Sequence, residues 1–277
     1  MTTKEEPDLI VEVTSTVLNG PPGSGDAIRT VFKIVGDARV QAKSAIIKQS
    51  TSFANPEGAE PLSLNSILDL IPPENRDEFY TYVQFSTFFV SFDDDLVSLE
   101  MLRSLSVIDL GCGNEYEAQE LARCASQSHQ FQPWLCRALH ALGVDVTGVD
   151  YRYPKRVNGK RTEDWKFLQA NLKEPNALSG IASNSADIIY SNSVFQFGGN
   201  KAPSLEAYGD KENQDIEDEI FQQALRILKH GGRLNIDMNV YEKSLAPDGL
   251  YFHFKWIKGK PLPKDYCHLD TDALIFE

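Results

Sequence analysis

The chain has 277 residues, of which 42% are hydrophobic and 24% are charged, a composition that supports a globular protein with a sizeable core. Its formal net charge of -13 repels phosphate backbones and argues against tight binding of nucleic acid. No signal-like N-terminus or long apolar span is apparent, so we expect a cytoplasmic protein without a membrane partner.

Residues 1–62 contain three strand-like apolar runs, at 9–13, 28–35 and 40–47, with glycine- and proline-rich punctuation between the first two. We expect a small β-rich appendage here. The glycine-rich turn lacks the Lys-Ser/Thr ending of a phosphate-binding loop, so no nucleotide site is predicted in it.

Residues 63–105 are predicted to be helical and are unusually aromatic. An apolar helical pattern ends at Pro72-Pro73, and seven aromatic residues then fall within 79–92. These rings either form a core face on the main sheet, which we favour, or an aromatic wall beside a functional site. The run at 93–95, three aspartates, predicts the start of another helix because negative charge is favourable at that end.

From residue 106 to 277 strands and helices alternate, which indicates a parallel sheet covered on both faces. A helix is predicted at 214–229, with an acidic first turn and a glycine at its end. A ligand would then bind at the carboxyl ends of the strands. The strands are expected at 106–110, 145–149, 166–169, 186–191 and 233–238, with a last pair near 251–257 and 272–276.

The most informative motif is Val107-Ile-Asp-Leu-Gly-Cys-Gly113, an apolar run that ends in Asp-x-Gly-x-Gly. A second apolar run ends in a lone acid, Asp150. Glycines allow the backbone to approach a ligand and adopt conformations denied to other residues. An acid at the tip of the neighbouring strand can accept hydrogen bonds from two ribose hydroxyls. Together these features predict a nucleoside-binding crevice.

This pattern resembles the class I S-adenosylmethionine-dependent methyltransferase family. Ser185-Ala-Asp-Ile-Ile-Tyr-Ser191 is similar to the family's fourth strand, and 224–237 is similar to its fifth helix and strand. The resemblance covers roughly 104–277 and implies an α/β fold, a Rossmann-like, mostly parallel sheet of seven strands with helices on both faces. It also implies S-adenosyl-L-methionine as cofactor and methyl transfer by in-line displacement as the reaction.

The resemblance further implies which residues contact the cofactor. Asp109 would approach its amino-acid end, Asp150 would bind the ribose, and the amide oxygen of Asn171 would face the adenine amino group. Ser191 stands beside the expected methyl-transfer position. The full expected set is Asp109, Gly111, Gly113, Glu115, Asp150, Asn171, Leu172 and Ser191.

Two features depart from the family pattern. Glu115 occupies the place of the usual third glycine, where its carboxylate either contacts the cofactor's ammonium group or points outwards. Asp150 lies 37 positions after Gly113, about twice the separation that the family suggests. The extra length falls in 114–132, so this insertion is either a lid over the cofactor or a helix lengthened for packing. We favour a lid that becomes ordered when the cofactor binds.

No residue is assigned a catalytic role. None of the five histidines lies in a pattern that singles out a general base, and methyl transfer from a sulfonium needs mainly in-line proximity. The segment 191–195 is not the Asn/Asp-Pro-Pro-aromatic motif of enzymes that methylate the amino groups of adenine or glutamine. We therefore expect a small-molecule acceptor, and neither its identity nor the oligomeric state follows from the sequence.

The cysteines and the basic residues have ordinary structural interpretations. The four cysteines, Cys112, Cys124, Cys136 and Cys267, show no metal-site spacing, so burial is favoured over redox chemistry and no metal is expected. The basic cluster at 152–161 is interpreted as a solvated loop rather than a phosphate-binding patch.

Two alternative functions stay open. A non-catalytic partner or binding module with this fold is compatible with Glu115, the insertion and the appendage. A nicotinamide-dependent dehydrogenase is less favoured, because the chain lacks the third glycine that packs the helix against the strand in that fingerprint.

Overall fold

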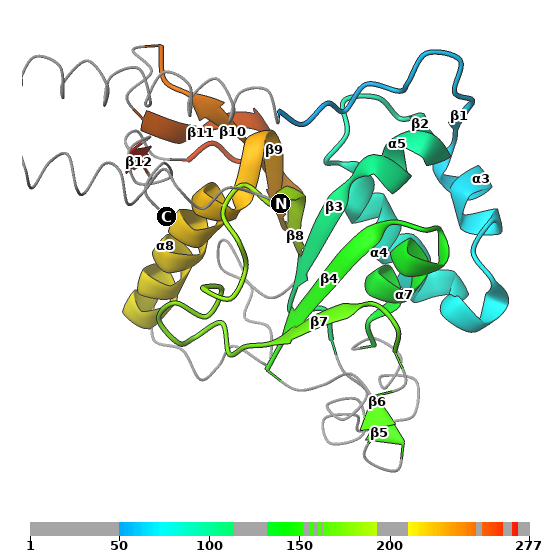
Figure 1. Cartoon of the computed structure of the whole chain (residues 1–277), viewed down its shortest axis with the longest axis horizontal. Coiled ribbons are helices and arrows are strands. Elements are labelled where there is room, and N and C mark those ends of the chain that lie inside the picture. The colour runs from blue at the N-terminus through cyan, green and yellow to red at the C-terminus, as the bar shows by residue number, and fades with distance from the viewer. Residues whose placement is uncertain are drawn as a thin grey trace, which may run out of the picture.

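A computed structural model describes residues 50–113, 132–151, 156–157, 160–161, 163–192, 210–247, 251–262 and 268–270. Its centre is a mixed sheet of eight strands in the order β12-β11-β10-β9-β8-β3-β4-β7 (Figure 1). The α/β class is therefore confirmed, with eight strands where seven were expected. The strands proposed for the N-terminal appendage, up to residue 47, lie outside the described residues.

Five strands of this sheet run parallel to their neighbours and carry the predicted site. All six residues of β8 are buried, as expected for a central strand covered on both faces. Four of the five lie within one residue of their predicted bounds, whereas β9 begins five residues earlier than expected. The strands are β3 (Ser106–Leu110), β4 (Asp145–Asp150), β7 (Lys166–Gln169), β8 (Ala186–Ser191) and β9 (Leu228–Ile236).

The remaining strands extend the sheet in antiparallel fashion: β10 (Asn239–Leu245), β11 (Tyr251–Lys258) and β12 (His268–Asp270). Strand β10 was missed from the sequence. It follows β9 after only two residues, Asp237 and Met238, which both have positive φ (49° and 66°). The turns of two-residue hairpins usually have the sequence Asn-Gly or Asp-Gly, which can be recognised in a sequence. This turn contains no glycine. The strand predicted at 272–276 lies outside the described residues.

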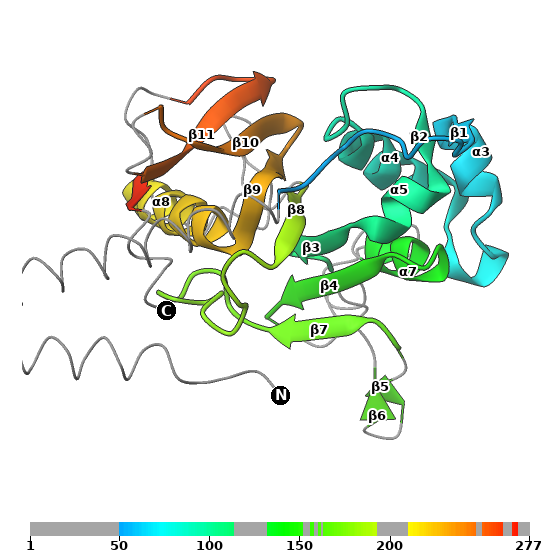
Figure 2. The ribbon, with the colours of Figure 1, turned by 45° about the horizontal axis from the view of Figure 1, so that its top comes forward.

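One face of the sheet is covered by short helices from the segment that was predicted to be helical, together with α7 (Figure 2). Gly143, with φ 87°, follows the end of α7. The elements are α3 (Leu64–Asp69), η1 (Pro73–Asn75), α4 (Glu78–Phe89), α5 (Leu99–Ser104) and α7 (Trp134–Ala141), with the small pair β1 (Pro61–Leu62) and β2 (Val97–Ser98).

The opposite face is covered by α8 (Asp210–Ile227), against which the side chains of Ile108 and Ile189 pack. Helices therefore cover both faces, as predicted. The helix ends two residues earlier than the predicted 229 because Leu228 already belongs to β9. Beyond β4 a small hairpin forms from β5 (Arg156–Val157) and β6 (Lys160–Arg161). No helix within the described ranges is long and apolar enough to cross a membrane.

The aromatic residues on and just after α4 differ in burial, and Tyr80 and Phe89 are partly buried. Phe85, Phe88 and Phe92 are fully buried in the core under the helix, which confirms the core interpretation for these rings. Phe79 and Tyr82 are 66% and 47% exposed. The proposed aromatic wall therefore stays a prediction for the rings outside the buried set.

The helix start predicted at 93–95 is wrong. Helix α5 begins at Leu99, where the Oγ of Ser98 accepts a hydrogen bond from the backbone N–H of Met101 at 3.1 Å. Asp93 instead pairs with the buried guanidinium of Arg233 at 2.8 Å. The hydrogen bond from Arg233 lowers the pKa of Asp93 below its usual value. A tertiary ion pair thus explains an acid that the local pattern assigned to a helix end.

Candidate cofactor-binding site

The loop after β3 bends back over the end of β4. Gly111 and Gly113 have φ angles of 68° and 92°, a region in which other residues are strained. The backbone N–H groups of Gly111 and Cys112 both donate to the carbonyl of Val149, at 2.8 and 3.1 Å. The positive φ angles of the two glycines therefore allow a tight turn at the carboxyl ends of two neighbouring parallel strands.

Asp150 joins the second half of the motif to the first. Its side chain is buried, and its Oδ2 accepts a hydrogen bond from the backbone N–H of Gly113 at 3.0 Å. Two residues 37 positions apart in the sequence are thus in direct contact. This contact places the carboxylate at the end of β4 directly beside the glycine loop.

Asp109 is the most unusual titratable group at this edge. It is 4% exposed, and the thiol of Cys136 donates a hydrogen bond to its Oδ2 at 3.4 Å. Burial, with a smaller contribution from the negative charge of Asp150, raises the pKa of Asp109 to about 7. No basic side chain in the described part of the chain pairs with this carboxylate. A cation placed beside it would be stabilised strongly, because little else compensates its charge.

The two thiols near Asp109 are packing groups. Cys112 and Cys136 are both free and buried. Burial raises the pKa of Cys112 to about 11 and that of Cys136 well above its ordinary value, so both stay protonated. Burial was the expected role and is confirmed for this pair. Cys124 and Cys267 lie outside the described residues.

Two matches with known proteins now complement this geometry, although no protein-family model matches the sequence. The arsenite methyltransferase of Mus musculus is 27% identical over 160 residues, 56% of this chain and 35% of that protein. The arsenite methyltransferase of Homo sapiens is 26% identical over 164 residues, 57% of this chain and 36% of that protein.

The chain is thus similar to two curated methyltransferases, which supports its resemblance to the class I S-adenosylmethionine-dependent methyltransferase family. It spans only about a third of the length of the curated relatives it matches. The match therefore supports the family, whereas activity and acceptor are treated below as proposals.

The other residues expected to bind the methyltransferase cofactor have local roles. The Oγ of Ser191, at the end of β8, donates to the carbonyl of Leu110 at 3.2 Å and is fully buried. The Oδ1 of Asn171 accepts from the backbone N–H of Lys173 at 3.2 Å, as in an Asx-turn. Leu172 packs on the α8 side of the sheet. The proposed contacts of Asn171 and Leu172 with adenine, and the place of Ser191 beside the methyl-transfer position, stay predictions.

The insertion at 114–132, which carries Glu115, lies outside the described residues apart from position 132. Its proposed role as a lid and the ammonium contact of Glu115 therefore stay predictions. Residues 193–209, which make up most of the loop that follows Ser191, also lie outside the described residues.

Several residues that shape the site were missed from the sequence. Gly148 lies under Cys112 and Trp165, and a Cβ there would come within 2.4 Å of the Trp165 ring. The side chain of Gln84 on α4 accepts a hydrogen bond from the backbone N–H of Leu135 at 2.7 Å, at the start of α7. Neither contact leaves a signal in sequence spacing, because both depend on how helices pack onto the sheet.

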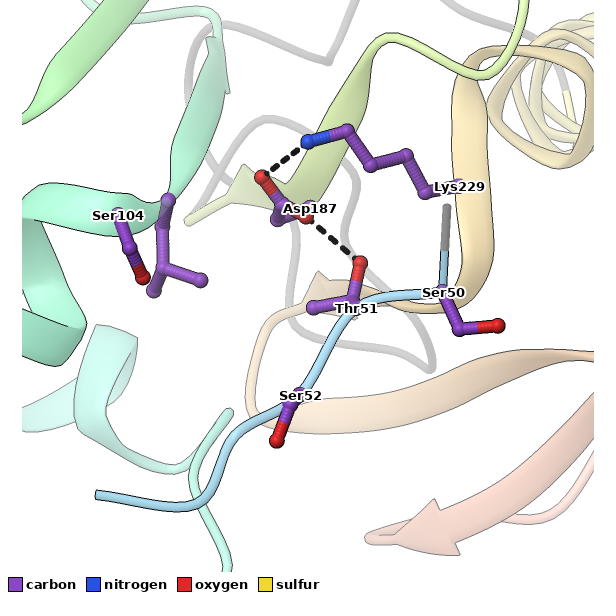
Figure 3. A pocket seen from close by; sticks show the side chains of 7 residues that line it. Ser50, Thr51, Ser52, Ser104, Asp187 and Lys229 are labelled. Atoms are coloured by element: carbon purple, nitrogen blue, oxygen red, sulfur yellow. Dashed lines mark hydrogen bonds and ion pairs between the residues drawn. The ribbon is translucent and has the colours of Figure 1, made fainter. Parts of the chain in front are cut away.

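A cavity of about 390 Å³ lies at the opposite edge, at the amino ends of β3, β8 and β9 (Figure 3). Asp187 in its wall accepts hydrogen bonds from Thr51 Oγ1 at 2.6 Å, Ser106 N at 2.8 Å and Lys229 Nζ at 2.8 Å. These contacts attach the segment before β1 to the base of the sheet. Because ligands of open α/β sheets bind at the carboxyl ends, we assign this cavity to packing rather than to the cofactor.

Proposed function

We propose that this protein is an S-adenosylmethionine-dependent methyltransferase that methylates a small molecule by in-line displacement. The observation that carries the proposal is the joint placement of Asp109, Asp150 and the Gly111–Gly113 loop. These residues meet at the carboxyl ends of β3 and β4, beside β8. The chain passes from β3 to β4 on one side and returns to β8 on the other, which makes this edge a topological switch point.

The residues at this edge fit the chemistry of the cofactor. When bound, it would supply an activated methyl group on a positively charged sulfur. Asp109 is a buried carboxylate without a basic partner within the described ranges, and it would hold the cofactor's cationic amino-acid end. Asp150 would accept hydrogen bonds from the ribose, and the glycine loop would bring its backbone close to both groups.

The name of the two relatives makes arsenite one candidate acceptor for this chain. The acidic net charge of -13 favours neutral or cationic acceptors over anionic ones and disfavours nucleic acid as a substrate. Water exclusion and alignment of the acceptor with the methyl group would provide most of the acceleration.

The proposal is tested by incubating the protein with methyl-labelled S-adenosylmethionine, arsenite and a panel of small amines, alcohols and thiols. We expect labelled product and stoichiometric S-adenosylhomocysteine with at least one acceptor. Tight cofactor binding without transfer to any acceptor would support the non-catalytic module instead. An absence of binding would remove the methyltransferase function altogether.

A further inference from the structure

The first turn of α7 is capped by a side chain from another helix. The residue before the helix is Pro133, whose side chain cannot accept a hydrogen bond from the helix N–H groups. The backbone N–H of Leu135, the second residue of α7, donates instead to Oε1 of Gln84 on α4 at 2.7 Å. Leu135 is buried, so without this acceptor a buried N–H would lack a partner, which is costly.

Gln84 is itself attached to the central strands of the sheet. Its backbone carbonyl accepts a hydrogen bond from the hydroxyl of Tyr190 at 3.2 Å. Tyr190 lies on β8 in register with Asp109 on β3. Three residues further along α4, the carbonyl of Thr87 accepts a hydrogen bond from Nδ2 of Asn235 on β9 at 2.9 Å. Helices α4 and α7 pack together on this face (Figure 2), so the strands that carry the site also fix the residue that caps α7.

The turn that Gln84 caps also carries Cys136, the residue directly after Leu135. The thiol of Cys136 donates a hydrogen bond to Oδ2 of Asp109 at 3.4 Å. This bond favours the ionised carboxylate and opposes burial, which raises the pKa of Asp109 to about 7. A cofactor ammonium group is attracted to the ionised form. The position of the thiol therefore affects how readily Asp109 can hold that group near neutral pH.

No other group facing Asp109 in the described part of the chain replaces the thiol. Cys136 alone donates a hydrogen bond to the carboxylate there. Asp150 on β4 is negative and raises the pKa of Asp109 further. Burial raises the pKa values of Cys112, Cys136 and Tyr190, so these three groups stay neutral over the physiological range. The ionisation of Asp109 is therefore sensitive to this one contact.

We propose that Gln84 is a positioning residue for the cofactor site, because its cap on α7 holds the Cys136 thiol against Asp109. This inference rests on the proposed methyltransferase function and adds a residue that lies outside the glycine motif. Without the cap, the first turn of α7 shifts and the thiol moves away from the carboxylate. Asp109 then ionises less readily and binds the amino-acid end of the cofactor more weakly.

The test compares two ligands that differ only at the amino-acid end. S-adenosylhomocysteine carries that end, whereas 5′-methylthioadenosine has the same adenosine and thioether without it. Gln84→Met keeps the length of the side chain and removes the acceptor. At pH 6.5 this variant should bind S-adenosylhomocysteine at least about fivefold more weakly than wild type and 5′-methylthioadenosine within about twofold. At pH 9 Asp109 is ionised in both proteins, so calorimetry should show a difference of less than about twofold for either ligand.

A matched control removes the cap at the other end of the same helix. Arg103 on α5 donates its Nε–H to the carbonyl of Leu142, after the last turn of α7, at 2.8 Å. Arg103→Met should lower the melting temperature as Gln84→Met does, because each variant leaves one end of α7 without a partner. It should leave the affinities for both ligands within about twofold of wild type, since Cys136 is not in the last turn.

A second variant tests the thiol directly and does not depend on how well Gln84→Met folds. Cys136→Ala should show the same loss of S-adenosylhomocysteine affinity at pH 6.5 and the same recovery at pH 9. Because Gln84 acts through Cys136, the double variant should bind within about twofold of Cys136→Ala alone.

The outcomes separate this inference from the function on which it rests. Failure of the wild-type protein to bind S-adenosylhomocysteine would overturn both. With normal wild-type binding, the inference alone falls if Gln84→Met weakens the two ligands equally or by the same factor at both pH values. It also falls if Arg103→Met has the same effect as Gln84→Met, or if Cys136→Ala binds S-adenosylhomocysteine as wild type does at pH 6.5.

Discussion

At the scale of single residues, the fold gives Asp109 a pKa that its position in the sequence does not predict. The motif indicates an acid at a strand end, and the surrounding helices then remove it from water. Burial raises its pKa to about 7, so that it titrates in the physiological range. The packing of Cys136 against the carboxylate is a tertiary effect that no local pattern encodes.

The titration of Asp109 predicts a specific dependence of stability on pH. Its pKa in the folded state lies above the ordinary value of 3.8, so the folded protein holds the proton more tightly than the unfolded chain does. The stability that this proton provides is fully present below about pH 4 and is lost as the pH rises through about 7. We expect the unfolding free energy of Asp109→Asn, relative to wild type, to rise by about 2–4 kcal/mol from pH 4.5 to pH 8.

Denaturant unfolding of both proteins at a series of pH values measures this difference. If the difference in unfolding free energy between the two proteins did not change with pH, the pKa of Asp109 in the folded protein would have its ordinary value.

The ribose contact of Asp150 gives a second prediction. Asp150→Ala should weaken binding of S-adenosylhomocysteine by roughly 1–3 kcal/mol, because it removes a charge-assisted acceptor and the hydrogen bond from Gly113. Asp145→Ala, at the other end of the same strand, should bind normally. If Asp150→Ala and the wild-type protein had equal affinities for S-adenosylhomocysteine in a competition titration, the ribose would lie elsewhere.

At the scale of elements, the close fit around β4 should be intolerant of even one methyl group. Gly148→Ala would bring a Cβ within 2.4 Å of Trp165 and 2.8 Å of the Cys112 sulfur, between the two loop glycines. We expect a loss of about 1–3 kcal/mol in unfolding free energy, together with weaker cofactor binding. Gly180→Ala is the matched control, because its Cβ would meet only Leu168, at 3.7 Å. Equal stability of the two variants would contradict the close packing of Trp165 on Gly148.

The parallel strands could be predicted from the sequence because their apolar runs are continuous and end in recognisable turn residues. Strand β8 has six buried residues in succession and matched its predicted bounds. Strand β10 could not be predicted, because the turn before it uses Asp237 and Met238 in a conformation that glycine and asparagine usually adopt. Asp93 was misassigned because its partner, Arg233, lies 140 positions away.

At the scale of the whole molecule, the two edges of the sheet have separate roles. The carboxyl edge carries the predicted site, whereas the amino edge anchors the segment before β1 through Thr51 and Asp187. Thr51→Val should lower the unfolding free energy by about 1 kcal/mol, since Asp187 loses one of its donors. Cofactor affinity should stay within a factor of about two, a change of no more than ~0.4 kcal/mol. A larger loss in a titration with S-adenosylhomocysteine would mean that the two edges are coupled.

The candidate site could be predicted from the sequence only where the pattern of strands along the chain indicates which residues lie close together. Asp109, the glycines and Asp150 end or follow adjacent parallel strands, so their meeting follows from the strand pattern. Gln84 enters the site region from a helix that precedes the sheet in the sequence, and its contact with Leu135 depends on how α4 and α7 pack. Such contacts need the assembled molecule.

The carboxyl edge of β3 and β4 is proposed above to bind S-adenosylmethionine, and every functional prediction depends on this. Titration calorimetry of the purified protein with S-adenosylhomocysteine tests it most directly. We expect one site per chain with a micromolar dissociation constant, about -8 kcal/mol. The absence of any binding heat, together with an unchanged melting temperature at millimolar ligand, would contradict it.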